Sequence, residues 1–515
     1  MGRNEIVMRA EKVVRNIFYD YLGNILTIIV GFISKTVFIY TLGEEYLGLS
    51  GLYTNVLTVL SLAELGIGSA ITFELYKPLA DKNNELLYGL MNFYKKAYQI
   101  IGWIVLVVGI MFVPFLKYII KFESNININY TLIYILFLLN SVFSYWFNAY
   151  KATILIASQQ KYLTKKIEYA LVIIQTIVQV GALFIWHSYV VFLLVGIVRS
   201  ILQNYLVAQK TDKVFPFLKE EKKLYLEEDI KERIYKNVYA MSLYKVSGVV
   251  VNSTDNIIIS AFISTNVLGR YSLYNYIIIS IKSFLAIIFD SFVAAIGNFN
   301  VTETDEKKKQ IFDVIFFLTF CLYGMMSVGL VQVSSLFVSL WAGEEYLMRN
   351  STVVLMVLVF LISGLENVTY IFRTGCGIYD IAKYRPVLSA VLNLVVSIIL
   401  VNRIGINGVF IGTIVSRMLS YWLVDPQVVY KHILHMPVTD YYKTYCKYIV
   451  ILLTSTLISQ FLSSFIQCEG WLLFIAKGLI AEIIFCGAIF IFYRKTHKYQ
   501  YLVSSISRIV RRRKG

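Results

Sequence analysis

The sequence predicts an all-α integral membrane protein with about 14 transmembrane helices. Its 515 residues are 58% hydrophobic and 16% charged, whereas soluble domains are roughly 45–50% apolar and 25% charged. Apolar runs of about 20 residues, enough to cross a hydrocarbon core about 30 Å thick, recur along the chain. Polar domain linkers are missing, and only 6 prolines interrupt the sequence. These observations exclude a soluble enzyme, a disordered chain and a disulfide scaffold.

Fourteen segments meet the length criterion, and several are long enough to tilt in the bilayer. The predicted spans are approximately residues 16–41, 46–72, 89–116, 130–150, 167–186, 189–208, 238–263, 268–293, 311–339, 351–372, 387–402, 406–428, 448–466 and 470–493.

The basic residues set the orientation of these spans, because loops on the cytoplasmic side carry an excess of Lys and Arg. With the N-terminus inside, the inner tracts, among them 373–385, hold about three quarters of the 48 basic residues. The outer connections hold Lys117, Lys121, Arg270, Arg349 and Arg403. One missed or extra helix would spoil this asymmetry, so both termini are predicted to be cytoplasmic. The net charge of +16 therefore reflects membrane topology, and no nucleic-acid partner is expected.

A highly charged connection near the middle divides the chain into two six-helix lobes. The expected organisation is a cytoplasmic N-terminal segment (1–15), an N-terminal lobe (16–208), a cytoplasmic linker (209–237), a C-terminal lobe (238–428), two additional transmembrane helices (448–493) and a basic cytoplasmic tail (494–515). A short repeat supports two related halves, because Leu47-Gly48-x3-Leu52-Tyr53 recurs as Leu268-Gly269-x3-Leu273-Tyr274. Parallel repeats of this kind occur in transporters. In the tail, apolar residues at helical spacing beside arginines predict an amphipathic helix on the membrane surface.

Charged residues inside the predicted spans are the main functional signal. A Lys, Arg or Asp at a helix centre costs about 2.5–3.5 kcal/mol on insertion scales, so such residues face a protein interior or a wet cavity. The basic ones are Lys35, Arg199, Lys245, Lys282, Arg417 and Lys477. The acidic ones in or near spans are Asp20, Glu64, Asp255, Asp290, Glu366 and Glu482.

Helical periodicity places several of these charges on polar stripes. In the first span Asp20, Asn24, Thr27 and Lys35 share one face, and in the tenth Ser363, Glu366, Tyr370 and Arg373 follow helical spacing. Facing stripes predict a hydrated central cavity.

Such a cavity with several cations selects an anion, and Arg can hold phosphate with two parallel bonds. The predicted substrate-binding cations are Lys35, Arg199, Lys245, Lys282 and Arg417. The predicted carriers of coupling H⁺ or Na⁺ are Asp20, Glu64, Asp255, Asp290 and Glu366. The alternative is that these charges pair and only fix helix packing, which we favour for Lys477 and Glu482. No metal site is expected from the five scattered cysteines, and no other cofactor is expected.

Two blocks resemble the polysaccharide transporters, the Wzx-type O-antigen and capsule flippases of the superfamily that also contains MATE exporters and lipid II flippases. They are GFISKTVFIYTLGEEYLGLSGLYTNVLTVLSLAELGIGSAI (31–71) and VVNSTDNIIISAFISTNVLGRYSLYNYI (250–277). The resemblance implies a V-shaped, MATE-like pair of six-helix lobes plus two C-terminal helices. It also implies alternating access that carries an undecaprenyl-diphosphate-linked oligosaccharide across the bacterial plasma membrane through a cationic lumen. Lys35 resembles a lumen charge of the first helix in the related flippases, and a polysaccharide polymerase is an expected partner.

Two other functions stay open at this point. An ion-coupled MATE-like drug or metabolite exporter would use the same fold, but five or six intramembrane bases argue against a cavity for cations. A membrane polysaccharide polymerase or glycosyltransferase would need a sizeable external site with acid and base groups. The predicted external connections are too short to build one, and neither a DxD nor a GxxxxGK motif occurs.

Overall fold

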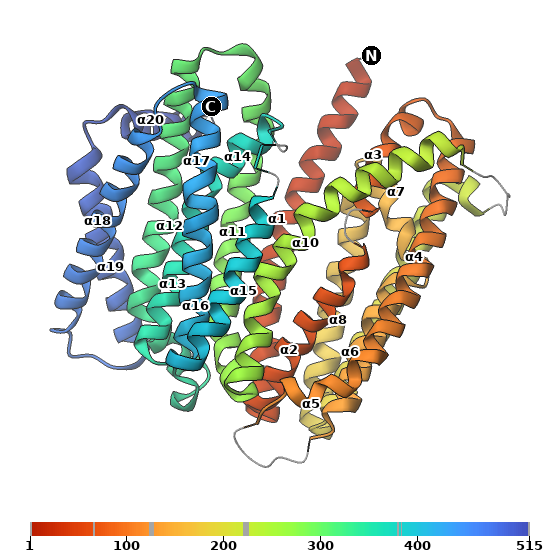
Figure 1. Cartoon of the computed structure of the whole chain (residues 1–515), viewed down its shortest axis with the longest axis horizontal. Helices are drawn as coiled ribbons and strands as arrows, with labels where there is room; N and C mark the ends of the chain where they lie inside the picture. Colours follow the sequence, from red (N-terminus) through yellow and green to blue (C-terminus); the bar gives the residue numbers. More distant parts are fainter. Residues whose placement is uncertain are drawn as a thin grey trace. The chain divides into compact units, whose positions relative to one another are not determined.

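The computed structural model describes residues 3–64, 67–122, 128–219, 226–378, 381–382 and 384–512. Among them all regular secondary structure is helical, as the sequence predicts (Figure 1). Contacts divide the chain into unit 1 (Met1–Gly269) and unit 2 (Arg270–Gly515), with the boundary inside one helix. The boundaries of lobes and linker given above therefore stay a prediction, while the packing assigns the helix after the linker to unit 1.

Unit 1 contains α1 (Arg3–Leu42), α2 (Glu44–Leu60), α3 (Ile67–Ala80), α4 (Asn84–Phe112), α5 (Leu116–Ile119), α6 (Tyr130–Tyr145), α7 (Ala152–Ala157), α8 (Lys161–Trp186), α9 (Tyr189–Val214), α10 (Glu228–Phe262) and the start of α11 (Thr265–Thr302). Unit 2 contains the rest of α11, α12 (Asp305–Trp341), α13 (Asn350–Leu365), α14 (Asn367–Gly375), α15 (Arg385–Ile404), α16 (Ile406–Arg417), α17 (Leu423–Val429), α18 (Thr439–Ser463), α19 (Gly470–Tyr493) and α20 (His497–Arg512).

Ten helices of the described residues are long and apolar enough to cross a membrane, or eleven if the bent pair α6 and α7 is one span. The predicted spans 46–72, 238–263 and 406–428 lie on helices that do not meet that test. The first is divided between α2 and α3, and the third between α16 and α17. The second is the polar helix α10, which is continuous. The chain is a multi-pass membrane protein, and the count of fourteen stays a prediction with which these helices are consistent.

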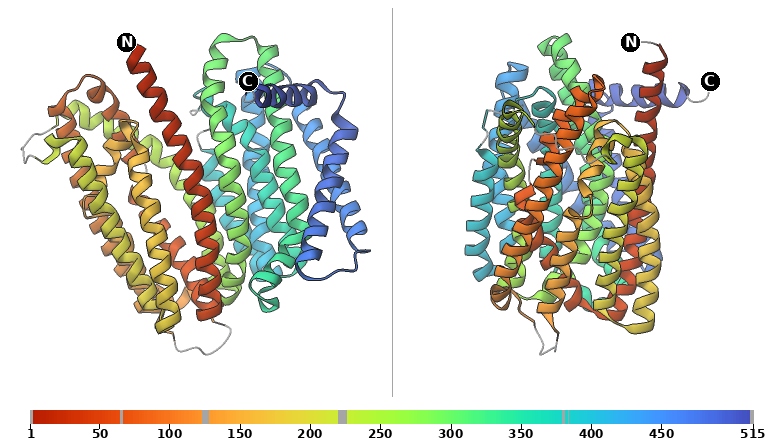
Figure 2. Two further views of the ribbon diagram at one scale, coloured as in Figure 1. Left: turned by 180° about the vertical axis from the view of Figure 1, so that it is seen from behind. Right: turned by 90° about the vertical axis from the view of Figure 1, so that its right-hand side faces the viewer.

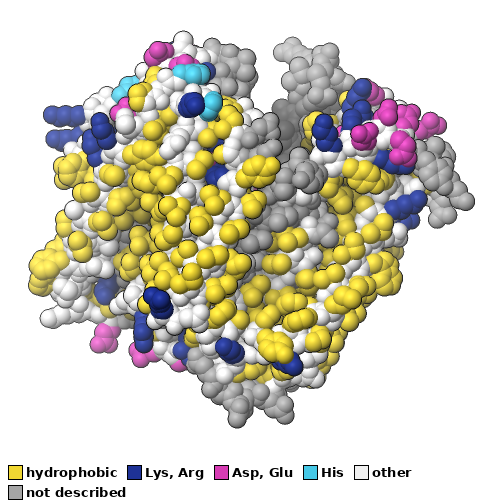
Figure 3. All heavy atoms as spheres, in the orientation of Figure 1, with side chains coloured by type: hydrophobic (Ala, Val, Ile, Leu, Met, Phe, Trp, Pro, Cys, Tyr) yellow, Lys and Arg dark blue, Asp and Glu magenta, His cyan; other side chains and the backbone are white. Residues whose placement is uncertain are grey.

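Apolar side chains cover the flank of each unit, as expected for surfaces that contact lipid. Figure 3 shows this apolar flank, with the charged side chains gathered toward the two ends of each unit. Many large residues on the flanks are exposed, among them Ile177, Leu472 and Ile491 at 67–71%. A soluble protein rarely exposes apolar patches of this extent. The surface therefore agrees with the hydropathy of the sequence.

The glycines of the repeated motif let α2 and α11 cross closely within unit 1. A Cβ atom added at Gly48 would lie 1.9 Å from the carbonyl oxygen of Thr265. A Cβ atom added at Gly269 would lie 2.2 Å from the carbonyl oxygen of Glu44. Each glycine of the motif thus packs against the backbone of the residue that stands four positions before the other glycine. This reciprocal contact is possible only because neither glycine has a side chain.

The tyrosines of the same motif also make equivalent contacts, each inside its own unit. The Tyr53 hydroxyl donates to the carbonyl oxygen of Tyr130 at the start of α6, at 2.8 Å. The Tyr274 hydroxyl accepts from the backbone N–H of Met348 just before α13, at 3.3 Å. These parallel roles support an internal duplication more strongly than four matched letters do.

The core of unit 2 is aromatic and centred on α12. Phe320 stacks on Tyr448 of α18 with ring centroids 4.0 Å apart, and Phe316 stacks on Tyr441 at 4.9 Å. Beyond α19 the chain turns, and α20 lies across the helices of unit 2 rather than along them (Figure 2). This orientation and the basic, amphipathic sequence of α20 are typical of a helix at a membrane surface.

Candidate functional site

Four of the predicted site residues line one cavity in unit 2. The cavity has a volume of about 340 Å³ and is lined by α11 and α12 and by α13 to α17. Lys282, Asp290, Glu366 and Arg417 all contribute to its wall, together with the aromatic side chains of Phe289, Tyr323, Tyr370 and Tyr421. We call it the unit 2 cavity.

Breaks in two helices bring acidic residues into this wall. Glu366 lies at the junction between α13 and α14. Asp425 lies in α17 directly before Pro426, whose missing N–H leaves the carbonyl of Trp422 without its helical donor. A π-helical turn (Met418–Trp422) precedes it, and the Tyr442 hydroxyl lies 3.4 Å from that carbonyl. Such irregular turns are frequent at functional sites.

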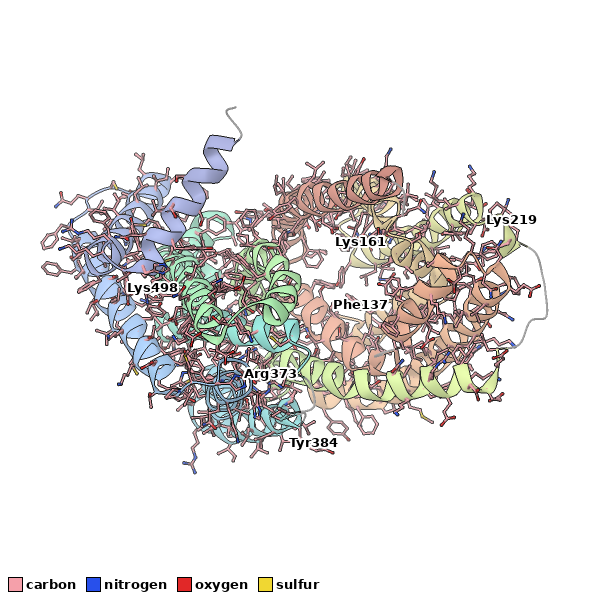
Figure 4. All side chains as sticks on the ribbon, turned by 90° about the horizontal axis from the view of Figure 1, so that it is seen from above. Phe137, Lys161, Lys219, Arg373, Tyr384 and Lys498 are labelled. Atoms are coloured by element: carbon pink, nitrogen blue, oxygen red, sulfur yellow. The ribbon has the colours of Figure 1, made fainter. Side chains whose placement is uncertain are left out.

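Buried ion pairs connect the helices around the cavity. Arg417 Nη1 donates to Glu366 Oε2 at 2.7 Å, with side chains 15% and 11% exposed. Asp425 pairs with both Arg373 and Arg385, and all three side chains are at most 10% exposed. Arg373 also donates to the carbonyl of Ile381 at 2.8 Å. Figure 4 labels Arg373, which lies inside unit 2 among the helix ends.

Two ionisable groups of the cavity remain outside these pairs. For Lys282 the described residues show neither a hydrogen bond nor an ion pair, and its ammonium lies 5.9 Å from the ring centre of Phe360. Within the same part of the chain Asp290 also makes neither a hydrogen bond nor an ion pair. Glu366 Oε1 is buried and has no hydrogen-bond partner among the described residues. As far as the described ranges extend, the cavity therefore offers one free cation and unused carboxylate oxygens.

The described wall of the unit 2 cavity carries as many cationic as acidic side chains. Lys282, Arg385 and Arg417 face Asp290, Glu366 and Asp425 around the wall, and Arg373 behind it adds a further positive charge. A guanidinium next to an aromatic ring holds planar, bidentate partners well, and Arg385 stacks on Tyr421 at 4.3 Å. The ion pairs are also consistent with the interpretation that these charges only fix helix packing, because each of the arginines is paired with a carboxylate. Lys282 is the one cation of this wall that the packing interpretation does not explain among the described residues.

The predicted residues of unit 1 are distributed over several helices. Asp20 on α1 pairs with Lys161 on α8 at 3.0 Å, near one end of the unit (Figure 4 labels Lys161). Glu64 accepts a 2.7 Å hydrogen bond from the Tyr98 hydroxyl. Tyr98 in turn packs against Tyr94 and Tyr145, so Glu64 lies in a tyrosine cluster.

The remaining predicted residues of unit 1 lie on three helices, α1, α9 and α10. Lys35 is half-buried on α1, and Asp255 is half-buried on α10. Arg199 is half-buried on α9, with no partner for its Nε among the described residues. Lys245 belongs to α10, but its side chain lies outside the described residues. Their roles as lumen residues stay a prediction.

Sequence reasoning missed Arg385 and Asp425 and treated the tract 373–385 as a cytoplasmic connection. Arg373 had a signal, because it continues the polar stripe of Glu366 and Tyr370 in the tenth span. Asp425 lies near the end of a predicted span, where charged residues are common and do not indicate a functional site. Pro426, directly after it, was the one feature of the sequence there that indicated a broken helix.

A metal centre is not supported by the described part of the chain. Within it no group of three or more His, Cys, Asp or Glu side chains could hold a metal ion.

Comparisons with known proteins give similarity only at the level of structure. No family model matches the chain, and no curated protein matches its sequence. The lipid II flippase MurJ in its inward closed conformation aligns over 92% of this chain and 98% of its own, with a TM-score of 0.64 and 14% identity. An inward-facing multidrug resistance MATE transporter of the MOP superfamily aligns over 79% and 96%, at TM-score 0.56 and 15% identity.

A third solved structure is that of a mutant of the Vibrio cholerae MATE transporter VcmN. It aligns over 84% of this chain and 99% of its own, at TM-score 0.56 and 12% identity. The chain thus has the fold of MurJ and the MATE transporters.

Proposed function

We propose that this chain is a flippase for undecaprenyl-diphosphate-linked oligosaccharides in the bacterial plasma membrane, and that it works by alternating access. The observation that carries the proposal is Lys282, an intramembrane cation without a partner among the described residues, in the wall of a polar cavity. The likeness to a protein described as a lipid II flippase supports the same class of substrate. The product would serve O-antigen, capsule or another surface polysaccharide.

Charge in the cavity explains how a diphosphate would be recognised. An unpaired ammonium in a low-dielectric region gains much from a phosphate, because it recovers the interaction that it lost on leaving water. Arg417 is paired with Glu366. A diphosphate would replace Glu366 as the partner of Arg417, and the released carboxylate would bind H⁺ or Na⁺. Substrate and coupling ion would then be linked through one ion pair.

The test is rescue of surface polysaccharide in a bacterial strain that lacks its own flippase. The wild-type chain is expected to restore the polymer, and Lys282→Gln is expected to lower it about tenfold or more, because a charge-assisted bond is lost. Lys477→Gln is the matched control, because Lys477 is also an intramembrane lysine but lies on α19 outside the cavity. Rescue by Lys282→Gln at equal membrane levels would refute the proposal.

An ion-coupled exporter of drugs or metabolites is the second candidate. It is favoured by the three carboxylates that line the unit 2 cavity, Asp290, Glu366 and Asp425, and by the likeness to MATE transporters. An exporter should confer resistance to cationic dyes that Asp290→Asn abolishes and Lys282→Gln leaves intact. The flippase should show the opposite dependence, with export of glycan that requires Lys282.

A further inference from the structure

Unit 1 contains a second candidate binding site, which lies apart from the unit 2 cavity proposed to bind the transported substrate. Two cavities of about 700 and 370 Å³ adjoin each other and share Lys95, Asn148 and Tyr150 in their walls. They form one groove between α4, the end of α6 and the segment after α9. We call it the α4–α6 groove. None of the ten residues predicted to bind substrate or ions is among the described residues that line it.

A sharp turn of the backbone builds the groove. Helix α6 ends at Tyr145, and the next residues include Phe147 and Asn148, which have positive φ values of 54° and 67°. Asn tolerates this conformation, but for a bulky residue such as Phe it is strained and must be held by its surroundings. Asn204 of α9 contributes by donating to the carbonyl oxygens of Phe143 (3.2 Å) and Trp146 (3.3 Å).

Close packing fixes one wall of the groove. A Cβ atom added at Gly102 of α4 would lie 2.2 Å from the Trp146 indole nitrogen, so the indole lies directly on the helix backbone. Trp103 packs against the same indole with ring centroids 5.2 Å apart. The wall therefore has a defined shape and presents two tryptophans.

Apart from its tryptophan wall, the groove is marked by its positive charge. In the described part of the chain four lysines line it, Lys95, Lys96, Lys151 and Lys219, against a single carboxylate, Asp212. Lys151 is buried and takes that carboxylate at 2.6 Å. Lys95 and Lys219 have neither a hydrogen bond nor an ion pair within the described ranges. The described lining of the groove thus carries excess positive charge, and Figure 4 labels Lys219 at one edge of unit 1.

An apolar stripe continues from the groove along α4. Ile100, Trp103, Ile104, Val107 and Met111 follow helical spacing on one face, and each is 44–68% exposed. Helix α4 is one of the candidate membrane spans, so this face contacts lipid. In Figure 3 basic and acidic side chains gather together at one end of unit 1, next to its apolar flank. Tryptophans beside lysines are typical of the boundary between hydrocarbon and headgroups.

We infer that the α4–α6 groove binds one anionic phospholipid of the bilayer, with its phosphate between Lys95, Lys96 and Lys219 and an acyl chain along the stripe of α4. A soluble phosphate compound would use the lysines alone, whereas a lipid would also lay an acyl chain on the stripe that continues from the groove along α4. A zwitterionic lipid would bring its own cation to a site that already has excess positive charge. The geometry therefore favours a lipid with net negative charge, and this site is independent of the proposed transport.

The experiment measures retained lipid on the intact purified chain. Native mass spectrometry is carried out on protein from bilayer discs of phosphatidylglycerol and phosphatidylcholine. The wild type is expected to retain one phosphatidylglycerol. The double variant Lys95→Gln/Lys96→Gln is expected to retain it about tenfold less often, because hydrogen bonds to charged groups are lost. Phosphatidylcholine is expected to be retained weakly by both.

A matched control removes the same charge elsewhere in unit 1. Lys166→Gln/Lys213→Gln changes two exposed lysines that do not line the groove, and it is expected to bind phosphatidylglycerol like the wild type. Equal losses in both double variants would mean nonspecific attraction and would overturn the inference. Displacement of the lipid by millimolar inorganic phosphate would also overturn it, because the site would then serve small anions. Trp103→Ala, which keeps every charge, is expected to weaken retention by a smaller factor.

Discussion

The two units hold their charged residues in different ways. In unit 1 the described ion pairs are separate from one another, as the pair of Asp20 and Lys161 and the pair of Lys151 and Asp212 show. In unit 2 three of the described pairs surround one cavity and connect different helices, with Asp425 between two arginines and Glu366 against Arg417. The difference indicates that unit 2 depends on a buried network of charges for its shape, whereas unit 1 can lose its exposed pair of Asp20 and Lys161 at small cost.

Loss of Asp425 should give the largest change. Asp425→Asn leaves Arg373 and Arg385 as buried, uncompensated charges, and removal of one partner from such a network costs about 3–5 kcal/mol. The apparent midpoint of thermal unfolding should fall strongly. Glu303→Gln is the control, because it breaks an exposed pair with Lys307 in the same unit and should leave the midpoint nearly unchanged. Equal midpoints for both variants would remove the contrast between buried and exposed pairs.

The pair of Glu366 and Arg417 separates packing from binding. Arg417→Ala should lower stability by about 3 kcal/mol and abolish export, because Glu366 is left buried without its partner. The exchanged variant Glu366→Arg/Arg417→Glu restores the pair with reversed direction and should recover most of the thermal stability. It should not recover export of the glycan, because the cation that faces the substrate has moved. Full export by the exchanged variant would support the packing interpretation.

A lysine outside the membrane spans gives a smaller, pH-dependent effect in unit 2. Lys498 of α20 lies 4.7–5.2 Å from the ring centres of Phe317, Tyr448 and Tyr493 and donates to the Tyr448 hydroxyl at 3.0 Å. Burial lowers its pKa to about 8 from 10.5, while Asp313 opposes this shift. When α20 is packed against these rings, Lys498 binds fewer protons between the two pKa values than it does when α20 is detached. The packing of α20 therefore becomes more favourable as pH rises from about 8 to 10.5.

Hydrogen exchange of the α20 amides checks this expectation. The ratio of protection factors between the wild type and Lys498→Met should rise with pH by up to about tenfold per unit in that window. Intrinsic exchange rates cancel in the ratio, because both proteins are measured at the same pH. A ratio that stays constant from about pH 8 to about pH 10 would contradict the lowered pKa.

The contrast between the units also explains what the sequence could predict. Long apolar runs predict helices and membrane spans because burial in lipid requires them, and the helices follow. Lys282, Glu366 and Arg417 were identified as candidates because a charge is costly in the middle of an apolar run. For Arg385 and Asp425 the sequence carried no such signal, since charges near span ends are not costly. These two residues meet at the cavity only in the folded chain.

The α4–α6 groove was beyond sequence reasoning for a related reason. Its wall depends on the change of chain direction at Phe147 and Asn148. No local sequence pattern predicts the positive φ values of these two residues. Its lysines come from α4, from the turn after α6 and from the segment after α9, and they meet only through the fold.

The smallest effect is expected for the exposed pair of unit 1. Asp20 and Lys161 are 36% and 41% exposed, so water already screens them, and such pairs contribute about 0–1 kcal/mol. A double-mutant cycle with Asp20→Asn and Lys161→Met should give a coupling energy below about 1 kcal/mol at low salt, and still less at about 1 M salt, where the screening length is about 3 Å. The same cycle on Glu366 and Arg417 should give a larger coupling that changes little with salt, because those side chains are 11% and 15% exposed. A coupling above about 2 kcal/mol between Asp20 and Lys161 would mean that unit 1 also depends on its ion pairs, since screened charges cannot interact so strongly.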